Sequence, residues 1–144
     1  MADQTLDDVQ PTGPQTPWDY LGLFPNAPTR PQIEAMQMQV PGGRLRLLPM
    51  KDGKRLFLLR AFSAIEMIAA QQEAAKVAPD KQLAAMQTNL VTRTVLWNSM
   101  NGGKVTEQDL QNSAAGLTST LYHAIADLSD FVEPQFLEQM FVDF

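Results

Sequence analysis

Proline is concentrated at the start of this chain, where seven of its ten prolines precede Arg44. These seven are Pro11, Pro14, Pro17, Pro25, Pro28, Pro31 and Pro41. Proline fixes φ and has no backbone N–H, so a proline every few residues is incompatible with a long helix or a central strand. We therefore predict an extended, proline-rich N-terminal arm over residues 1–31, followed by a single domain over residues 32–144.

An apolar island lies between the prolines of the predicted arm. It consists of Trp18, Tyr20, Leu21, Leu23 and Phe24. Two interpretations are open: the island folds back on its own domain, or it docks on a partner as a linear motif. Aromatic anchors concentrate binding energy at protein interfaces. On the second interpretation, Trp18, Tyr20 and Phe24 are candidate partner-binding residues.

Residues 33–60 change to a strand-like pattern. Apolar and polar residues alternate over residues 36–40 and again over residues 44–47. Glycine-containing turns follow both stretches, and the second turn leads into an apolar run at residues 55–60. Period-two alternation between such turns predicts an antiparallel meander of two or three strands, which needs other elements packed on one face.

A helix is predicted from about Ala64 to Val77. Ser63 and Glu66 have the spacing of a capping box, in which the hydroxyl and the carboxylate each accept a hydrogen bond from a backbone N–H at the helix start. Pro79 is expected to end the helix, because the residue before a proline avoids the helical conformation.

Three further helices are expected along the rest of the chain. One should run from about Lys81 to Met100, and the next begins at Thr106 and carries an apolar stripe to Leu128. Pro134 is expected to open a short last helix. The predicted fold class is α+β: a small antiparallel β-meander, three main helices and a short C-terminal helix, preceded by the extended arm.

Composition narrows the partners that this chain can have. The formal net charge of -5 disfavours nucleic acid and anionic membranes. No apolar stretch approaches the roughly 20 residues that span a bilayer, and the first residues are acidic, unlike a signal peptide. We expect a cytoplasmic protein with no nucleic-acid partner and no membrane partner.

Catalytic signatures are missing from the sequence. There is no cysteine, and His123, the one histidine, has no recognisable nucleophile to activate. No phosphate-binding or dinucleotide-binding glycine motif occurs. We therefore expect a protein that is not an enzyme, with no cofactor and no metal site, in which His123 is a structural or surface residue.

Basic residues cluster in the predicted strands, whereas the chain from Val105 onward is acidic and has no lysine or arginine. The alternation should place Arg44 and Arg46 toward solvent or a partner, opposite the apolar face that packs on the helices. These two residues and Arg55 are therefore candidate partner-binding residues. The other interpretations are charges that complement each other within the fold, head-to-tail association in a homo-oligomer and, least favoured, nucleic acid.

The order of these segments resembles the tail-assembly chaperones of long-tailed bacteriophages. The resemblance covers roughly residues 36–130. It rests on a basic hairpin, on the segment Leu59-Arg60-Ala61-Phe62-Ser63-Ala64-Ile65-Glu66-Met67-Ile68, and on Val91-Thr92-Arg93-Thr94-Val95-Leu96-Trp97-Asn98 after an Ala/Gln-rich stretch. The proline-rich arm and the aromatic C-terminal region depart from the family pattern.

This resemblance implies a non-enzymatic helper in the host cytoplasm that binds another phage tail or baseplate protein, such as the tape-measure protein. A structural virion adaptor, at a baseplate, tail or neck, is the alternative, because extended arms also hold neighbouring subunits. A second alternative is an accessory subunit of an enzyme.

Overall fold

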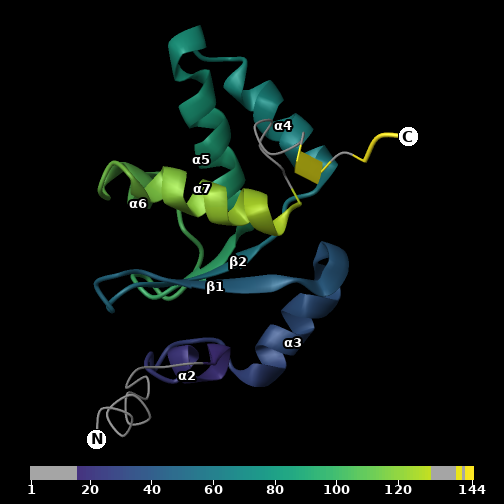
Figure 1. Cartoon of the computed structure of the whole chain (residues 1–144). Coiled ribbons are helices and arrows are strands. Elements are labelled where there is room, and N and C mark those ends of the chain that lie inside the picture. Colours follow the sequence, from purple (N-terminus) through teal and green to yellow (C-terminus); the bar gives the residue numbers. More distant parts are fainter. Residues whose placement is uncertain (1–15, 131–138, 141) are drawn as a thin grey trace, which may run out of the picture.

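The computed structural model describes residues 16–130, 139, 140 and 142–144. The described residues form a three-stranded antiparallel sheet in the order β1-β2-β3, with helices on both faces, so the α+β class is confirmed (Figure 1). The strands are β1 (Leu45–Pro49), β2 (Leu56–Arg60) and β3 (Val95–Asn98). The α-helices are α2 (Pro17–Leu21), α3 (Arg30–Gln39), α4 (Ala64–Ala74), α5 (Gln82–Thr94), α6 (Glu107–Gln111) and α7 (Leu117–Leu128), and short 3-10 turns cover Pro41–Gly43 and Pro79–Lys81.

Two layers of helix enclose the sheet. Helices α4, α5 and α7 lie on one face, and α2 and α3 lie on the other (Figure 1). Strand β2 contributes side chains to a core on each face of the sheet. Phe57 and Leu59 pack into the first core, on the side of α4, α5 and α7. Leu56 and Leu58 pack into the second core, on the side of α2 and α3. The unbroken apolar run of β2 is explained by burial on both faces. No helix in the described part of the chain is long and apolar enough to cross a membrane.

The prediction of a strand over residues 36–40 is wrong, because residues 36–39 belong to helix α3 and Val40 is its C-cap. Thr29 and Gln32 form a capping box, and proline stands in the first turn, where its missing N–H costs no hydrogen bond. Ile33 and Met36, one turn apart, pack toward the sheet. The third strand of the sheet comes instead from residues 95–98.

The helix predicted over residues 81–100 ends earlier than expected, at Thr94. Thr94 and Val95 are β-branched, and Val95 leaves the helix in an extended conformation to start β3. The helix predicted from Thr106 to Leu128 is divided into α6 and α7. A short connection that contains Gly116 separates the two.

The extended arm is corrected for residues 16–31. Thr16 and Asp19 form a capping box that opens α2, and Leu21 at its end is only 6% exposed. The apolar island therefore folds back on its own sheet, which is the first of the two interpretations. Residues 1–15 lie outside the described residues, and so does most of the helix expected at Pro134, of which Gln139 and Met140 are described and are helical.

The capping box at Ser63 is confirmed, and helix α4 starts where it was predicted to start, although it ends at Ala74 rather than Val77. The Ser63 hydroxyl accepts a hydrogen bond from the N–H of Glu66, and the Glu66 carboxylate accepts one from the N–H of Ser63. Replacing Ser63 with alanine should lower the free energy of unfolding by about 0.5–2 kcal/mol. Urea denaturation of both proteins measures this, and unchanged stability would show that the cap contributes nothing.

Candidate functional site

Strand β1 is an edge strand whose outer backbone groups have no partner among the described residues. The N–H of Met50 donates to the carbonyl of Arg55, which fixes the alternation of the β1–β2 ladder. Arg46 and Leu48 therefore bond to β2, and the backbone groups of Leu45 and Leu47 point outward. Pro49 also points outward, where its missing N–H breaks no ladder bond.

A groove runs along this edge, between β1 and helix α2. We call it the β1 groove and define it by two neighbouring cavities of about 130 and 320 Å³. Both cavities are lined by Pro17, Leu45, Arg46 and Leu47. The first also contacts Trp18, Leu21, Ile33, Gln37 and Leu58, and the second contacts Tyr20 and Pro49. Apolar side chains beside an open strand edge can bind an extended polypeptide through both backbone and side-chain contacts.

Trp18 and Tyr20 form the wall that α2 contributes to the groove. The guanidinium carbon of Arg30 lies 4.6 Å from the centroid of the Trp18 ring, so a cation–π contact holds the indole in place. Tyr20 is half-buried against the second core, between the sheet and helices α2 and α3. Both rings are thus fixed by the fold and retain exposed area for a ligand.

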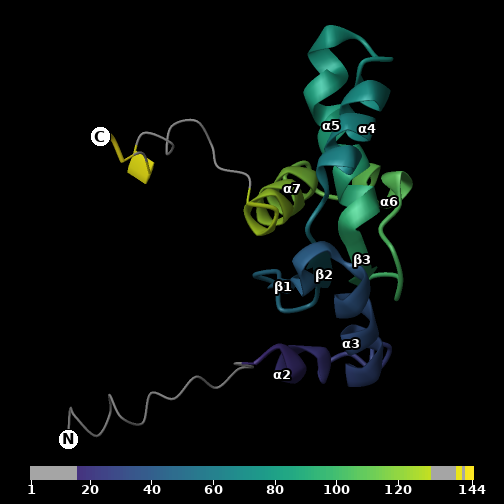
Figure 2. The ribbon, with the colours of Figure 1, turned by 90° about the vertical axis from the view of Figure 1, so that its right-hand side faces the viewer.

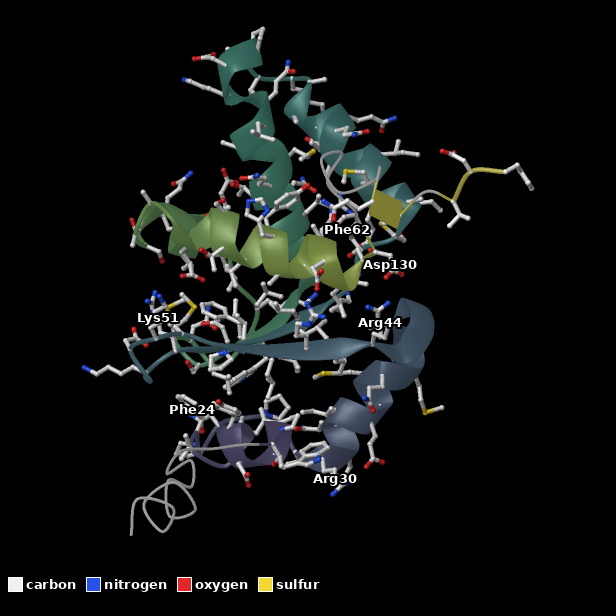
Figure 3. The ribbon with its side chains drawn as sticks, in the orientation of Figure 1. Phe24, Arg30, Arg44, Lys51, Phe62 and Asp130 are labelled. Carbon is white, nitrogen blue, oxygen red and sulfur yellow. The ribbon has the colours of Figure 1, made fainter. Side chains whose placement is uncertain are left out.

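Arg44 and Arg46 were predicted to point toward solvent or a partner, but both form ion pairs with acidic residues of the fold. Arg46 donates to the carboxylate of Asp127 at 2.7 Å and to the carbonyl of Ala124, and Arg44 donates to Asp130 at 3.1 Å. Figure 3 shows Arg44 and Asp130 facing each other between β1 and α7. The alternation itself is confirmed, since Leu45 and Leu47 pack on the opposite face. The sheet is covered on both faces, so the arginines meet acidic residues of the fold itself.

Arg55 lies beyond the other end of β1, at the turn that joins it to β2. Its Nε donates to Asp52 at 2.9 Å. A hydrogen bond from the backbone N–H of Lys54, together with Arg55, holds the pKa of Asp52 below its ordinary value. In the described part of the chain, Lys51 and Lys54 form no salt bridge. Positive charge therefore remains available at this end of the groove (Figure 3).

Phe24 lies away from the β1 groove, beneath β3. Its ring meets Trp97 edge-on, with the centroids 6.2 Å apart. The indole nitrogen of Trp97 is buried and has no hydrogen-bond partner among the residues that the structure describes. Part of the β3 edge is already used, because the N–H of Asn98 donates to the carbonyl of Gly103. Phe24 is therefore a core contact, and β1 is the more open edge of the sheet.

No cluster of three or more histidine, cysteine, aspartate or glutamate residues that could hold a metal occurs within the described residues. His123 is exposed on α7, with its ring edge-on to Tyr122 at 5.5 Å.

Of the predicted partner-binding residues, the structure brings Trp18 and Tyr20 together at the β1 groove. Arg46 also lines the groove, but its guanidinium pairs with Asp127 of α7. Arg44, Arg55 and Phe24 lie elsewhere. The sequence reasoning missed Leu45, Leu47 and Pro49 as groove residues. Pro49 carried a usable signal, because a proline within a strand pattern indicates an edge strand.

Comparison with known proteins gave no relatives: no family model matches the sequence, and neither curated proteins nor solved structures produced a match.

Proposed function

We propose that this protein is a non-enzymatic assembly factor that binds an extended segment of another protein along the β1 groove. The open edge of β1, beside an apolar groove, is the observation that carries the proposal. Added strands gain affinity from main-chain hydrogen bonds and specificity from pockets for alternate side chains. Lys51 and Lys54 would attract a partner segment that carries acidic residues.

The sequence resemblance suggests the class of partner. Tail-assembly chaperones bind the tape-measure protein of a phage tail and keep it soluble until the tube subunits assemble. We therefore propose that the partner is a tape-measure protein and that the chain acts in the host cytoplasm. A long, unassembled protein offers extended segments of the kind that an open strand edge can bind.

Two substitutions at one position test this proposal. Leu47→Pro removes the outward N–H of β1 and the leucine side chain, whereas Leu47→Ala removes only the side chain. Neither breaks a β1–β2 hydrogen bond. Leu47→Pro should therefore weaken binding clearly more than Leu47→Ala does. Calorimetric titration of a tape-measure segment into each variant measures the difference, and melting curves confirm that both are folded. Equal affinity of the two variants would exclude strand addition at β1.

A structural virion adaptor is the second candidate. It is favoured by the outermost described residues, because Met140, Val142 and Phe144 are exposed and could hold a neighbouring subunit. A chaperone leaves before the particle is complete, whereas an adaptor remains in it. Mass spectrometry of purified virions decides between them: presence of the chain in the particle would replace the chaperone with the adaptor.

A further inference from the structure

The outer side of β1 limits how a partner segment can pair with this strand. Leu45 and Leu47 each present an N–H and a carbonyl there, whereas Pro49 presents a carbonyl alone. In Figure 2, β1 lies at the edge of the sheet with α2 beneath it, so an added strand would lie beside β1 along the groove. Two complete pairs of backbone groups, two residues apart, therefore set the register of a segment that binds.

An antiparallel segment uses these backbone groups in full. One of its residues lies opposite Leu45 and another, two positions earlier in the segment, lies opposite Leu47. Each exchanges two hydrogen bonds with its leucine. The sheet is already antiparallel, and antiparallel pairs are slightly more stable per residue than parallel pairs. Such a segment runs from the Pro49 end of β1 to the Leu45 end.

The two faces of the sheet define a residue pattern for that segment. Directly opposite residues point to the same face, so the residues opposite Leu45 and Leu47 point toward α2. There they reach the cavities of about 130 and 320 Å³, of which the larger extends to Pro49. The residue between them points to the other face, where Arg46 already pairs with Asp127. The segment should therefore carry apolar residues at alternate positions, with uncharged residues between them.

Unpaired positive charge lies beyond the Pro49 end of the groove. Lys51 and Lys54, in the turn after β1, are exposed and form no salt bridge with any residue that the structure describes. Arg44 and Arg46 do not add to this charge, because both are paired with aspartates of the fold. An acidic residue in the bound segment is therefore attracted toward the turn.

We propose that the β1 groove selects an antiparallel segment that has an acidic N-terminal end followed by apolar residues at alternate positions. The acidic end lies beside Lys51 and Lys54, and the apolar residues occupy the two cavities along β1. This inference rests on the proposed function, and it adds the direction and the residue pattern of the bound segment. A segment parallel to β1 would have to carry its acidic residues at its C-terminal end.

Two synthetic peptides of identical composition test the direction. One is Glu-Glu-Ser-Val-Thr-Val-Thr-Val-Ser, the other is the same sequence reversed, and both have blocked ends. The first should bind about fivefold more tightly or better at low salt, and the difference should shrink as salt screens the charges. Fluorescence anisotropy of labelled peptides measures both dissociation constants. Equal affinities, tighter binding of the reversed peptide, or no binding of either would overturn the proposal.

Charge reversal in the turn tests whether the lysines attract the acidic end. Lys51→Glu and Lys54→Glu, made singly, should each weaken binding of the first peptide about threefold or more at low salt. Lys81→Glu is the matched control, because Lys81 is also exposed but lies in the turn Pro79–Lys81, far from β1 (Figure 1). It should leave the affinity unchanged. If neither turn variant binds more weakly than the control, the acidic end does not lie at the turn and the proposal falls.

The proposed function and this inference can fail separately. If Leu47→Pro abolishes binding of both peptides and of the tape-measure segment, but the two peptides bind equally well, the inference falls and the proposed function stands. If the first peptide is preferred and its binding is lost in Leu47→Pro, but no tape-measure segment binds, the inference stands and the proposed function falls. Melting curves show that each variant is folded.

Discussion

Replacement of Leu21 with alanine should lower the free energy of unfolding by about 2–5 kcal/mol, because a buried leucine is lost and a cavity remains. Leu21 is 6% exposed and packs with Ile33, Leu58 and Trp97 in the second core. The helix that carries it would then be held less firmly on the sheet, and the wall of the β1 groove would loosen with it.

Leu23→Ala is the matched control for this prediction. Leu23 lies two residues further along the same segment but is 60% exposed, so its loss should change stability by less than about 0.5 kcal/mol. Urea denaturation with tryptophan fluorescence follows both variants, since Trp97 is in the affected core. Equal stabilities of the two variants would mean that residues 16–31 do not belong to the folded domain in solution.

Replacement of Arg60 with methionine should lower the free energy of unfolding by about 1–3 kcal/mol, because several half-buried acceptors lose a charged donor together. Arg60 donates to both carboxylate oxygens of Glu66, at 2.8 and 2.7 Å, and to the carbonyls of Ala61 and Arg93. It therefore connects the end of β2 to the start of α4 and the end of α5. Lys76→Met, which removes an exposed ion pair with Glu73, should cost no more than about 0.5 kcal/mol.

The same substitution should change how stability depends on pH. The hydrogen bonds from Arg60 hold the pKa of Glu66 below its ordinary value of 4.5. The resulting stabilisation is complete above that pH and is lost as the pH falls through the lower pKa of the folded state. Arg60→Met should therefore destabilise strongly at pH 7 and less at acidic pH. Unfolding curves at pH 7 and at about pH 3 measure this, and an equal loss at both would contradict the role of the ion pair.

Local features of the sequence predicted several elements correctly. The capping box at Ser63 and Glu66 marked the start of α4, because its hydrogen bonds form within four neighbouring residues. The two strands of the hairpin over residues 45–60 were also predicted, since alternation and a glycine-containing turn specify them locally. These signals act over a few residues and do not depend on the rest of the fold.

Elements with two possible conformations were decided by tertiary packing. Residues 36–40 alternate like a strand, but Ile33 and Met36 bury one helical face against the sheet. Val95 and its neighbours continue a helical segment in the sequence, yet they supply β3 because β2 needs a second partner. In each case the buried area that decided the conformation came from residues distant in the sequence.

What the sequence determined by itself was the alternation of β1, which separates Leu45 and Leu47 from Arg44 and Arg46. Only the tertiary structure decided what meets each face. Helix α7 brings Asp127 to Arg46, and the N-terminal segment covers the leucines where the sequence had suggested an extended arm. Period-two geometry is a property of the local backbone, whereas the partner of each face depends on how distant helices pack. That packing left the edge of β1 open, and the candidate site lies there.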